Sequence, residues 1–288
     1  MSRSASTVSN GSVRSFAEDP AALAFVEKLR ARDPRIDPLS AVPEVNPARI
    51  PRHVAMIMDG NGRWAEQSGR PRLFGHHSGT ETVRTVVKEA LKLGVEQVTL
   101  YAFSTENWRR PTAEVSGLME LCAAYCTGEA PLLLEENVRV RVIGDLEPMP
   151  REVREGLSGL ERATRLCTGV TMCLAVNYGG RQEIVRAVRR IAERVGRGEL
   201  GVGAIDEAAI EAELDTAGMP EPDLLIRTGG DSRVSNYMLW QISYAEIHVT
   251  STLWPDFGCE DFRAAVRDFA SRERRFGGLA GAAPVGGS

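Results

Sequence analysis

Long apolar runs, paired cysteines and a large excess of one charge are all missing from this chain of 288 residues. No apolar run reaches the ~18 residues that a membrane span needs, and no signal-peptide pattern opens the chain. The five cysteines form no Cys-x-x-Cys pair, which favours free thiols in a reducing compartment. We therefore expect a soluble, cytoplasmic protein.

The charges nearly cancel, because 35 Lys and Arg face 39 Asp and Glu and leave a net charge of −4. A protein that binds nucleic acid through its phosphates usually carries a strongly basic surface. We therefore expect no nucleic-acid partner, although a balanced total can hide local clusters of one sign. The composition, 43% hydrophobic and 26% charged, is that of a globular protein.

Composition divides the chain into three parts. Residues 1–48 start with a serine-rich stretch and are then broken by Pro34, Pro38, Pro43 and Pro47. We expect a flexible N-terminal extension there. Residues 49–278 form the main domain. Residues 279–288 are rich in glycine and alanine, and we expect a disordered tail.

Apolar runs alternate with helical patterns throughout the main domain. The predicted strands are residues 53–58, 97–103, 138–143, 170–176, 223–227 and 246–250. The predicted helices are residues 78–93, 115–136, 151–166, 181–195, 206–214 and 259–275. A capping box of Ser78 and Glu81 would open the first helix, and Gly94 would end it. This alternation predicts a single α/β domain with a mostly parallel six-stranded sheet flanked by helices.

Three predicted strands are followed by arginine together with Gly, Ser or Asn, in residues 59–64, 104–111 and 227–235. Ligands of open α/β sheets bind beyond the carboxyl ends of the strands. Guanidinium groups grip phosphate oxygens, and the carboxylate of Asp59 is a suitable Mg²⁺ ligand. Any tight turn also needs Gly and Asn, so one such loop alone would be ambiguous. The three together predict a polyphosphate site.

Basic residues also precede the predicted helix start at Ser78. Arg70, Arg72, His76 and His77 would oppose the positive end of the helix dipole unless an anion lies there. This arrangement again favours a phosphate ligand.

Six motifs, in order, together resemble the cis-prenyltransferases, the family of bacterial undecaprenyl diphosphate synthase. They are HVAMIMDGNGRWA, GHHSG, LYAFSTENWRRP, VNYGGR, IRTGGDSRVSN and LWPDF to RRFGG, over residues 52–278. The resemblance implies an enzyme that condenses isopentenyl diphosphate with an allylic diphosphate, such as farnesyl diphosphate, into a medium- or long-chain Z-polyprenyl diphosphate. It also implies Mg²⁺ as cofactor, an apolar tunnel for the product tail, a homodimer, and peripheral membrane contact for product release.

The resemblance assigns roles to matching residues. Asp59 would hold Mg²⁺, with Glu246 completing the metal site near the dimer interface. Asn107, with Ser104 nearby, would position the incoming alkene and assist proton loss, for which the released diphosphate is a competing base. The residues implied for the allylic substrate are Gly60, Asn61, Gly62, Arg63, Trp64, Arg72, His76, Trp108 and Arg110. The resemblance also implies that Thr105 and Glu106 of the LYAFSTENWRRP motif bind substrate. The residues implied for isopentenyl diphosphate are Arg227, Arg233, Val234 and Ser235.

The sequence departs from the family pattern in two places. Asp231-Ser232 stands where bacterial members commonly have Glu-His, and Pro131 would interrupt the helix expected to line the tunnel. The small Ala102 favours a medium or long product tail.

Two other functions compete with this one. A non-catalytic subunit of a heteromeric prenyltransferase would not need Asp59, Arg227, Arg233 and Glu246, all of which are present. A Mg²⁺-dependent phosphohydrolase would need a nucleophile or a Walker loop, and neither pattern is recognisable. The DDxxD motif of the all-helical trans-prenyltransferases is also absent.

Overall fold

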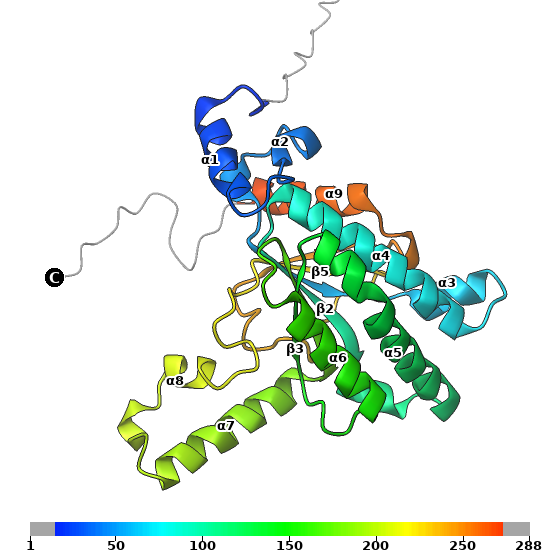
Figure 1. Cartoon of the computed structure of the whole chain (residues 1–288), viewed down its shortest axis with the longest axis vertical. Coiled ribbons are helices and arrows are strands. Elements are labelled where there is room, and N and C mark those ends of the chain that lie inside the picture. The colour runs from blue at the N-terminus through cyan, green and yellow to red at the C-terminus, as the bar shows by residue number, and fades with distance from the viewer. Residues whose placement is uncertain (1–14, 273–288) are drawn as a thin grey trace, which may run out of the picture.

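The computed structural model describes residues 15–272. Helices surround a central sheet (Figure 1), which has six strands. Its strands are β1 His53–Ile57, β2 Gln97–Ser104, β3 Arg139–Ile143, β4 Thr171–Tyr178, β5 Leu224–Arg227 and β6 Glu246–Val249. They lie in the order β3-β4-β2-β1-β5-β6, and every pair is parallel. The predicted α/β domain and its six strands are confirmed.

Helices flank the sheet. They are α3 Asn61–Gln67, α4 Arg72–Leu93, α5 Thr112–Glu135, α6 Arg151–Thr164, α7 Gly180–Gly196, α8 Glu207–Glu211 and α9 Cys259–Ser271. Short 3₁₀ turns are η1 Pro47–Arg49, η2 Thr105–Arg109, η3 Val202–Ala204 and η4 Trp254–Asp256. In the described part of the chain, no helix is both long and apolar enough to cross a membrane.

The alternation of side chains along β1 separates two cores. Val54 and Met56 face the larger core, which contains apolar residues of α4, α5, α6 and α9. Ala55 and Ile57 face the smaller core on the other side, where Tyr237 is fully buried. Because both faces are covered, the strands are apolar nearly throughout, as parallel strands must be.

Helix α4 begins six residues earlier than the capping pattern predicts. It starts at Arg72, after Pro71, and the hydroxyl of Ser78 donates within the helix to the carbonyl of Phe74 (3.1 Å). The predicted cap at Ser78 is therefore wrong. Its predicted end is right, since Gly94 closes the helix with a φ of 83°. Arg72 and His76 thus belong to the first turns of α4 itself.

Helix α5 runs without a break through Pro131, so the predicted interruption is also wrong. A proline removes one backbone hydrogen bond from a helix. Buried Glu129 and Leu133 hold the helix in place on either side of it.

Residues 15–48 pack against the domain, which differs from the expectation of a flexible extension. They form helices α1 Pro20–Arg30 and α2 Pro38–Ala41, and Ile36, Val42 and Val45 belong to the larger core. The backbone N–H of Asp37 donates to the carbonyl of Lys92 at the end of α4 (2.8 Å). Pro20, Pro38 and Pro47 each begin a helix or 3₁₀ turn, where the missing N–H costs little. Residues 1–14 and the tail predicted at 279–288 lie outside the described residues.

This packing predicts that the extension stabilises the domain. Ile36 is fully buried, so we expect Ile36→Ala to lower the free energy of unfolding by about 3 kcal/mol. Ile205→Ala, at a side chain that is 40% exposed, is the control and is expected to cost less than about 1 kcal/mol. Urea unfolding of both variants measures the difference. Equal stabilities would contradict the packing of residues 15–48.

Candidate active site

The carboxyl ends of β1 and β5 bring Asp59 and Arg227 together. Ile57 is level with Arg227 in the sheet, and Asp59 lies just beyond. The guanidinium of Arg227, only 4% exposed, donates to Asp59 Oδ2 (2.9 Å), to Asp231 Oδ2 (3.1 Å) and to the hydroxyl of Ser235 (2.7 Å). The Arg63 guanidinium lies 3.1 Å from Asp59 Oδ1. Asp59 is thus held between two arginines.

Asp59 is a stable anion in this setting. Burial alone would raise its pKa, but the hydrogen bond from Arg227 and the charges of Arg63 and Arg227 outweigh burial and hold the pKa below its usual value. Buried Thr228 fixes the backbone of Asp59, because its hydroxyl accepts from the Asp59 N–H (2.9 Å) and donates to the Asp59 carbonyl (2.7 Å). A charged, fixed carboxylate is what a divalent cation requires.

Arg233 extends this cluster outward. Its guanidinium donates to Asp231 Oδ2 (2.6 Å), and its backbone carbonyl accepts from Arg227. We call Asp59, Arg63, Arg227, Asp231, Arg233 and Ser235 the β5 cluster. Arg227 Nε is buried and has no hydrogen-bond partner among residues 15–272. Val234, by contrast, packs against the smaller core.

A second group of cations surrounds Glu114, in the first turn of α5. Glu114 Oε1 accepts from Arg110 Nη1 (2.9 Å) and lies 3.8 Å from His76 Nε2, and Glu114 Oε2 lies 3.4 Å from Arg72 Nε. Burial and the charge of Arg110 lower the pKa of His76 to about 4, so this imidazole is neutral at physiological pH. We call Arg72, His76, Arg110 and Glu114 the α4–α5 cluster.

The two clusters approach each other at the start of α3. Gly60 precedes this helix with a φ of 111°, and no side chain from the described residues caps the first turn. A Cβ on Gly62 would overlap the guanidinium of Arg72, so only glycine lets that arginine lie against the turn. Trp64, farther along α3, donates its indole N–H to Asp256 (2.7 Å) and stacks on Phe74.

The residues after β2 form the 3₁₀ turn η2. Asn107 Oδ1 accepts from the backbone N–H of Ser104 (3.1 Å), which fixes the Asn107 amide. The indole N–H of Trp108 donates to Asn177 (2.8 Å). Glu106 accepts from Asn236 (2.9 Å). The buried hydroxyl of Thr105 has no partner among the described residues.

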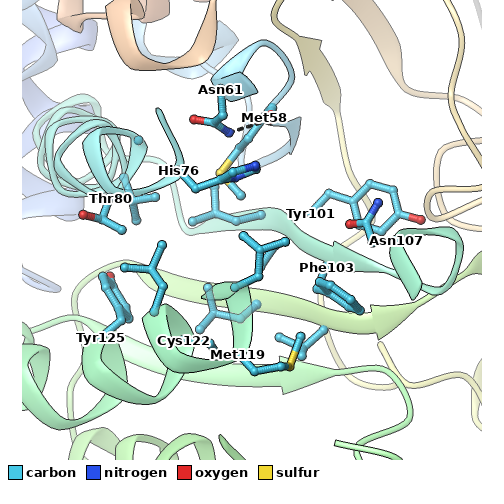
Figure 2. A pocket seen from close by; sticks show the side chains of 18 of the residues that line it. Met58, Asn61, His76, Thr80, Tyr101, Phe103, Asn107, Met119, Cys122 and Tyr125 are labelled. Atoms are coloured by element: carbon cyan, nitrogen blue, oxygen red, sulfur yellow. Dashed lines mark hydrogen bonds between the residues drawn. The ribbon is translucent and has the colours of Figure 1, made fainter. Parts of the chain in front are cut away.

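A cavity opens beside the α4–α5 cluster, which contributes His76 and Arg110 to its lining, and extends into the larger core (Figure 2). Asn61, His76 and Asn107 are polar lining residues, and Figure 2 shows Met119, Cys122 and Tyr125 of α5 among the residues that line the same cavity. Its volume of about 190 Å³ far exceeds the ~10–15 Å³ that one water needs. The buried Oδ1 of Asn61 has no donor among residues 15–272. The cavity therefore joins a polar mouth to an apolar interior.

Glu246 does not join Asp59 within this chain. It opens β6 level with Leu224, which pairs with Val54 near the start of β1, whereas Asp59 follows the end of β1. Its carboxylate instead accepts from Arg272 (2.7 Å). Within one chain Glu246 lies at the opposite end of the strands from Asp59, so a metal site that uses both carboxylates needs a second copy of the chain, and the assignment of Glu246 near a dimer interface stays a prediction. No group of three or more His, Cys, Asp or Glu that could hold a metal occurs among the described residues.

Sequence reasoning missed Glu114, Thr228 and Asp256. Glu114 follows Arg110 at a spacing of four, which often marks an ion pair at a helix start, so a signal existed. Thr228 lies within the predicted loop 227–235 and Asp256 within the LWPDF motif, but neither motif indicates that the side chain fixes another residue, the backbone of Asp59 in one case and the indole of Trp64 in the other.

Comparisons with known proteins identify the family of the chain. Residues 57–277 match the family model described as "Putative undecaprenyl diphosphate synthase". The isoprenyl transferase of Clostridium perfringens is 47% identical over 80% of this chain and 91% of its own. The ditrans,polycis-undecaprenyl-diphosphate synthase ((2E,6E)-farnesyl-diphosphate specific) of Escherichia coli is 49% identical over 81% of this chain and 92% of its own.

Solved structures resemble the fold as well. Lavandulyl diphosphate synthase from Lavandula x intermedia, in complex with dimethylallyl diphosphate, has a TM-score of 0.78 and 35% identity over 80% of this chain and 99% of its own. A probable undecaprenyl diphosphate synthase from Campylobacter jejuni has a TM-score of 0.66 and 33% identity over 79% of this chain and 98% of its own. Matched in sequence, in fold and in the order of its motifs, this chain belongs to the undecaprenyl diphosphate synthase family of prenyltransferases.

Proposed function

We propose that the chain is a Mg²⁺-dependent cis-prenyltransferase that condenses isopentenyl diphosphate with farnesyl diphosphate into a medium- or long-chain Z-polyprenyl diphosphate. The supporting observation is an apolar cavity lined by His76 and Arg110 of the α4–α5 cluster, together with a second arginine cluster at the carboxyl ends of β1 and β5. Two diphosphates need two separate sets of guanidinium groups. A growing hydrocarbon tail needs an apolar space that excludes water.

The donor set around Asp59 fits Mg²⁺ shared with a substrate. Mg²⁺ in proteins is often bound by one or two carboxylates together with substrate phosphates and water. Asp59 is a fixed, partly exposed anion at the rim, by which we mean the edge of the sheet formed by the carboxyl ends of its strands. Asp59 would hold the ion. When bound there, Mg²⁺ would neutralise charge that develops on the leaving diphosphate.

The remaining residues position the reactants. Arg72 and Arg110, with the neutral His76, would hold the allylic diphosphate, and its tail would enter the cavity. Arg227, Arg233 and Ser235 would hold isopentenyl diphosphate. The allylic C–O bond breaks and releases diphosphate, the allylic carbon bonds to the isopentenyl alkene, and the proton lost from the isopentenyl unit passes to the released diphosphate. The fixed amide of Asn107 at the cavity mouth would orient the alkene for this step.

The assignment of Glu246 to the metal site now requires a second copy of the chain. We retain the homodimer as part of the proposal, with Glu246 contributed by the partner subunit. The cytoplasmic location and a peripheral membrane contact for product release are likewise proposed. The membrane contact follows from the apolar product expected of this reaction, and the location follows from the five free cysteines.

Loss of the metal-binding carboxylate tests the enzyme assignment. With Mg²⁺, farnesyl diphosphate and labelled isopentenyl diphosphate, we expect the wild-type chain to form a butanol-extractable polyprenyl diphosphate. Asp59→Ala should lower turnover about a thousandfold or more, because charge on the leaving group is no longer neutralised. Glu207→Ala, at an exposed residue of α8, is the control for removal of an acidic side chain. Near-normal turnover in a folded Asp59→Ala variant would refute the metal assignment.

A crossed pair of variants tests the two diphosphate sites. Arg233→Ala should raise the KM for isopentenyl diphosphate about tenfold or more and leave that for farnesyl diphosphate unchanged, since a hydrogen bond to a charged group is worth about 1.5–3 kcal/mol. Arg110→Ala should raise the KM for farnesyl diphosphate and leave that for isopentenyl diphosphate unchanged. Steady-state kinetics with each substrate varied in turn measures both constants. A rise in the same KM for both variants would show that the sites are wrongly divided.

A further inference from the structure

The α4–α5 cluster already contains an anion. Glu114, whose side chain is 12% exposed, is the carboxylate to which Arg72, His76 and Arg110 all point. Arg72 also pairs with Glu66 (2.8 Å), but that carboxylate is 53% exposed and lies on the outer side of the pair. Glu114 therefore occupies the position between the cations that an incoming phosphate group would need.

The charges around the free cluster are compensated by carboxylates. Arg72 and Arg110 carry two positive charges, His76 is neutral because its pKa is lowered to about 4, and Glu114 carries one negative charge. Glu66, which pairs with Arg72 from outside the cluster, supplies a second negative charge. A diphosphate would therefore meet no net positive charge from these five side chains as long as Glu114 keeps its contacts. It would also be repelled by a partly buried carboxylate a few ångströms away, where the repulsion is stronger than in water.

We propose that Glu114 is an internal competitor for the allylic diphosphate. In the free chain it holds Arg72 and Arg110 in place, and substrate binding displaces it from both guanidinium groups. This inference rests on the proposed assignment of the α4–α5 cluster to the allylic substrate. Glu114 is a positioning residue, since it acts on the substrate through the arginines. The same competition assists release of a diphosphate from these arginines, because any anion bound there must compete with Glu114.

A purely structural role for Glu114 makes a different prediction. An acidic residue in the first turn of a helix stabilises the helix dipole, and Glu114 lies there in α5. Loss of that role would lower the melting temperature and leave the affinity for farnesyl diphosphate unchanged or weaker. Loss of an internal competitor would instead strengthen that affinity.

The experiment compares Glu114→Gln with Glu135→Gln in the full chain. Glu135 is an exposed residue at the last turn of α5, about 30 Å from Glu114 along the helix, so its substitution changes the net charge equally. Isothermal titration with farnesyl thiodiphosphate, a slowly reacting analogue, gives the dissociation constant. We expect Glu114→Gln to lower this constant about tenfold and Glu135→Gln to leave it unchanged. The constant for isopentenyl diphosphate should not change in either variant.

Kinetics gives a second readout. For Glu114→Gln the KM for farnesyl diphosphate should fall while kcat does not rise. Glu114→Asp retains the charge but withdraws it by one methylene, so it should show a smaller decrease in the dissociation constant. It also serves as the informative variant if Glu114→Gln does not fold.

Three results would overturn the inference. If Glu114→Gln binds farnesyl thiodiphosphate no more tightly than the wild-type chain does, Glu114 does not compete with the diphosphate. An equal gain in both glutamine variants assigns the effect to net charge alone. If Arg110→Ala leaves the affinity of the otherwise wild-type chain for farnesyl thiodiphosphate unchanged, the allylic site itself is wrongly placed. That last result separates failure of the proposed function from failure of the role of Glu114.

Discussion

The contact on which the site depends is the one between buried Arg227 and Asp59. It exists because β1 and β5 are adjacent and parallel and end at the same level. A guanidinium that is 4% exposed is costly to bury unless carboxylates pair with it. Asp59 and Asp231 both do so, and Asp59 is in turn fixed by Thr228. The sheet order thus creates a charged carboxylate and a buried arginine at one point of the rim.

The same principle shapes both clusters, since each group of arginines is paired with carboxylates of the chain. Asp59 and Asp231 pair with Arg227, and Glu114 pairs with Arg110. This pairing explains how a chain with a net charge of −4 carries a rim suited to diphosphates. An anionic substrate of such a rim must exchange places with the protein's own acids, and the cost of that exchange sets how tightly it is held.

Much of the sheet and several residues of the site were predictable from local sequence. Apolar runs located all six strands, and the polar residues after them located Asp59, Asn107 and Arg227, because parallel strands present their carboxyl ends at one edge. The start of α4 was not predictable from the Ser78 capping pattern, since Pro71 had already started the helix. Ile36 and Val42 looked like part of a proline-broken tail because their burial depends on α4. Glu246 opens the predicted strand 246–250, at the other end of the sheet from Asp59, so its part in the metal site depends on a second copy of the chain, which the sequence of one copy does not display.

The central claim is that one rim holds two diphosphates in two separate arginine clusters. A crystal structure of the full chain with Mg²⁺, farnesyl thiodiphosphate and isopentenyl diphosphate tests it most directly. We expect one diphosphate on Arg72 and Arg110 with its tail in the cavity beside Met119, and the other on Arg227 and Arg233. Both diphosphates in one cluster, or a prenyl tail outside the cavity, would contradict the account.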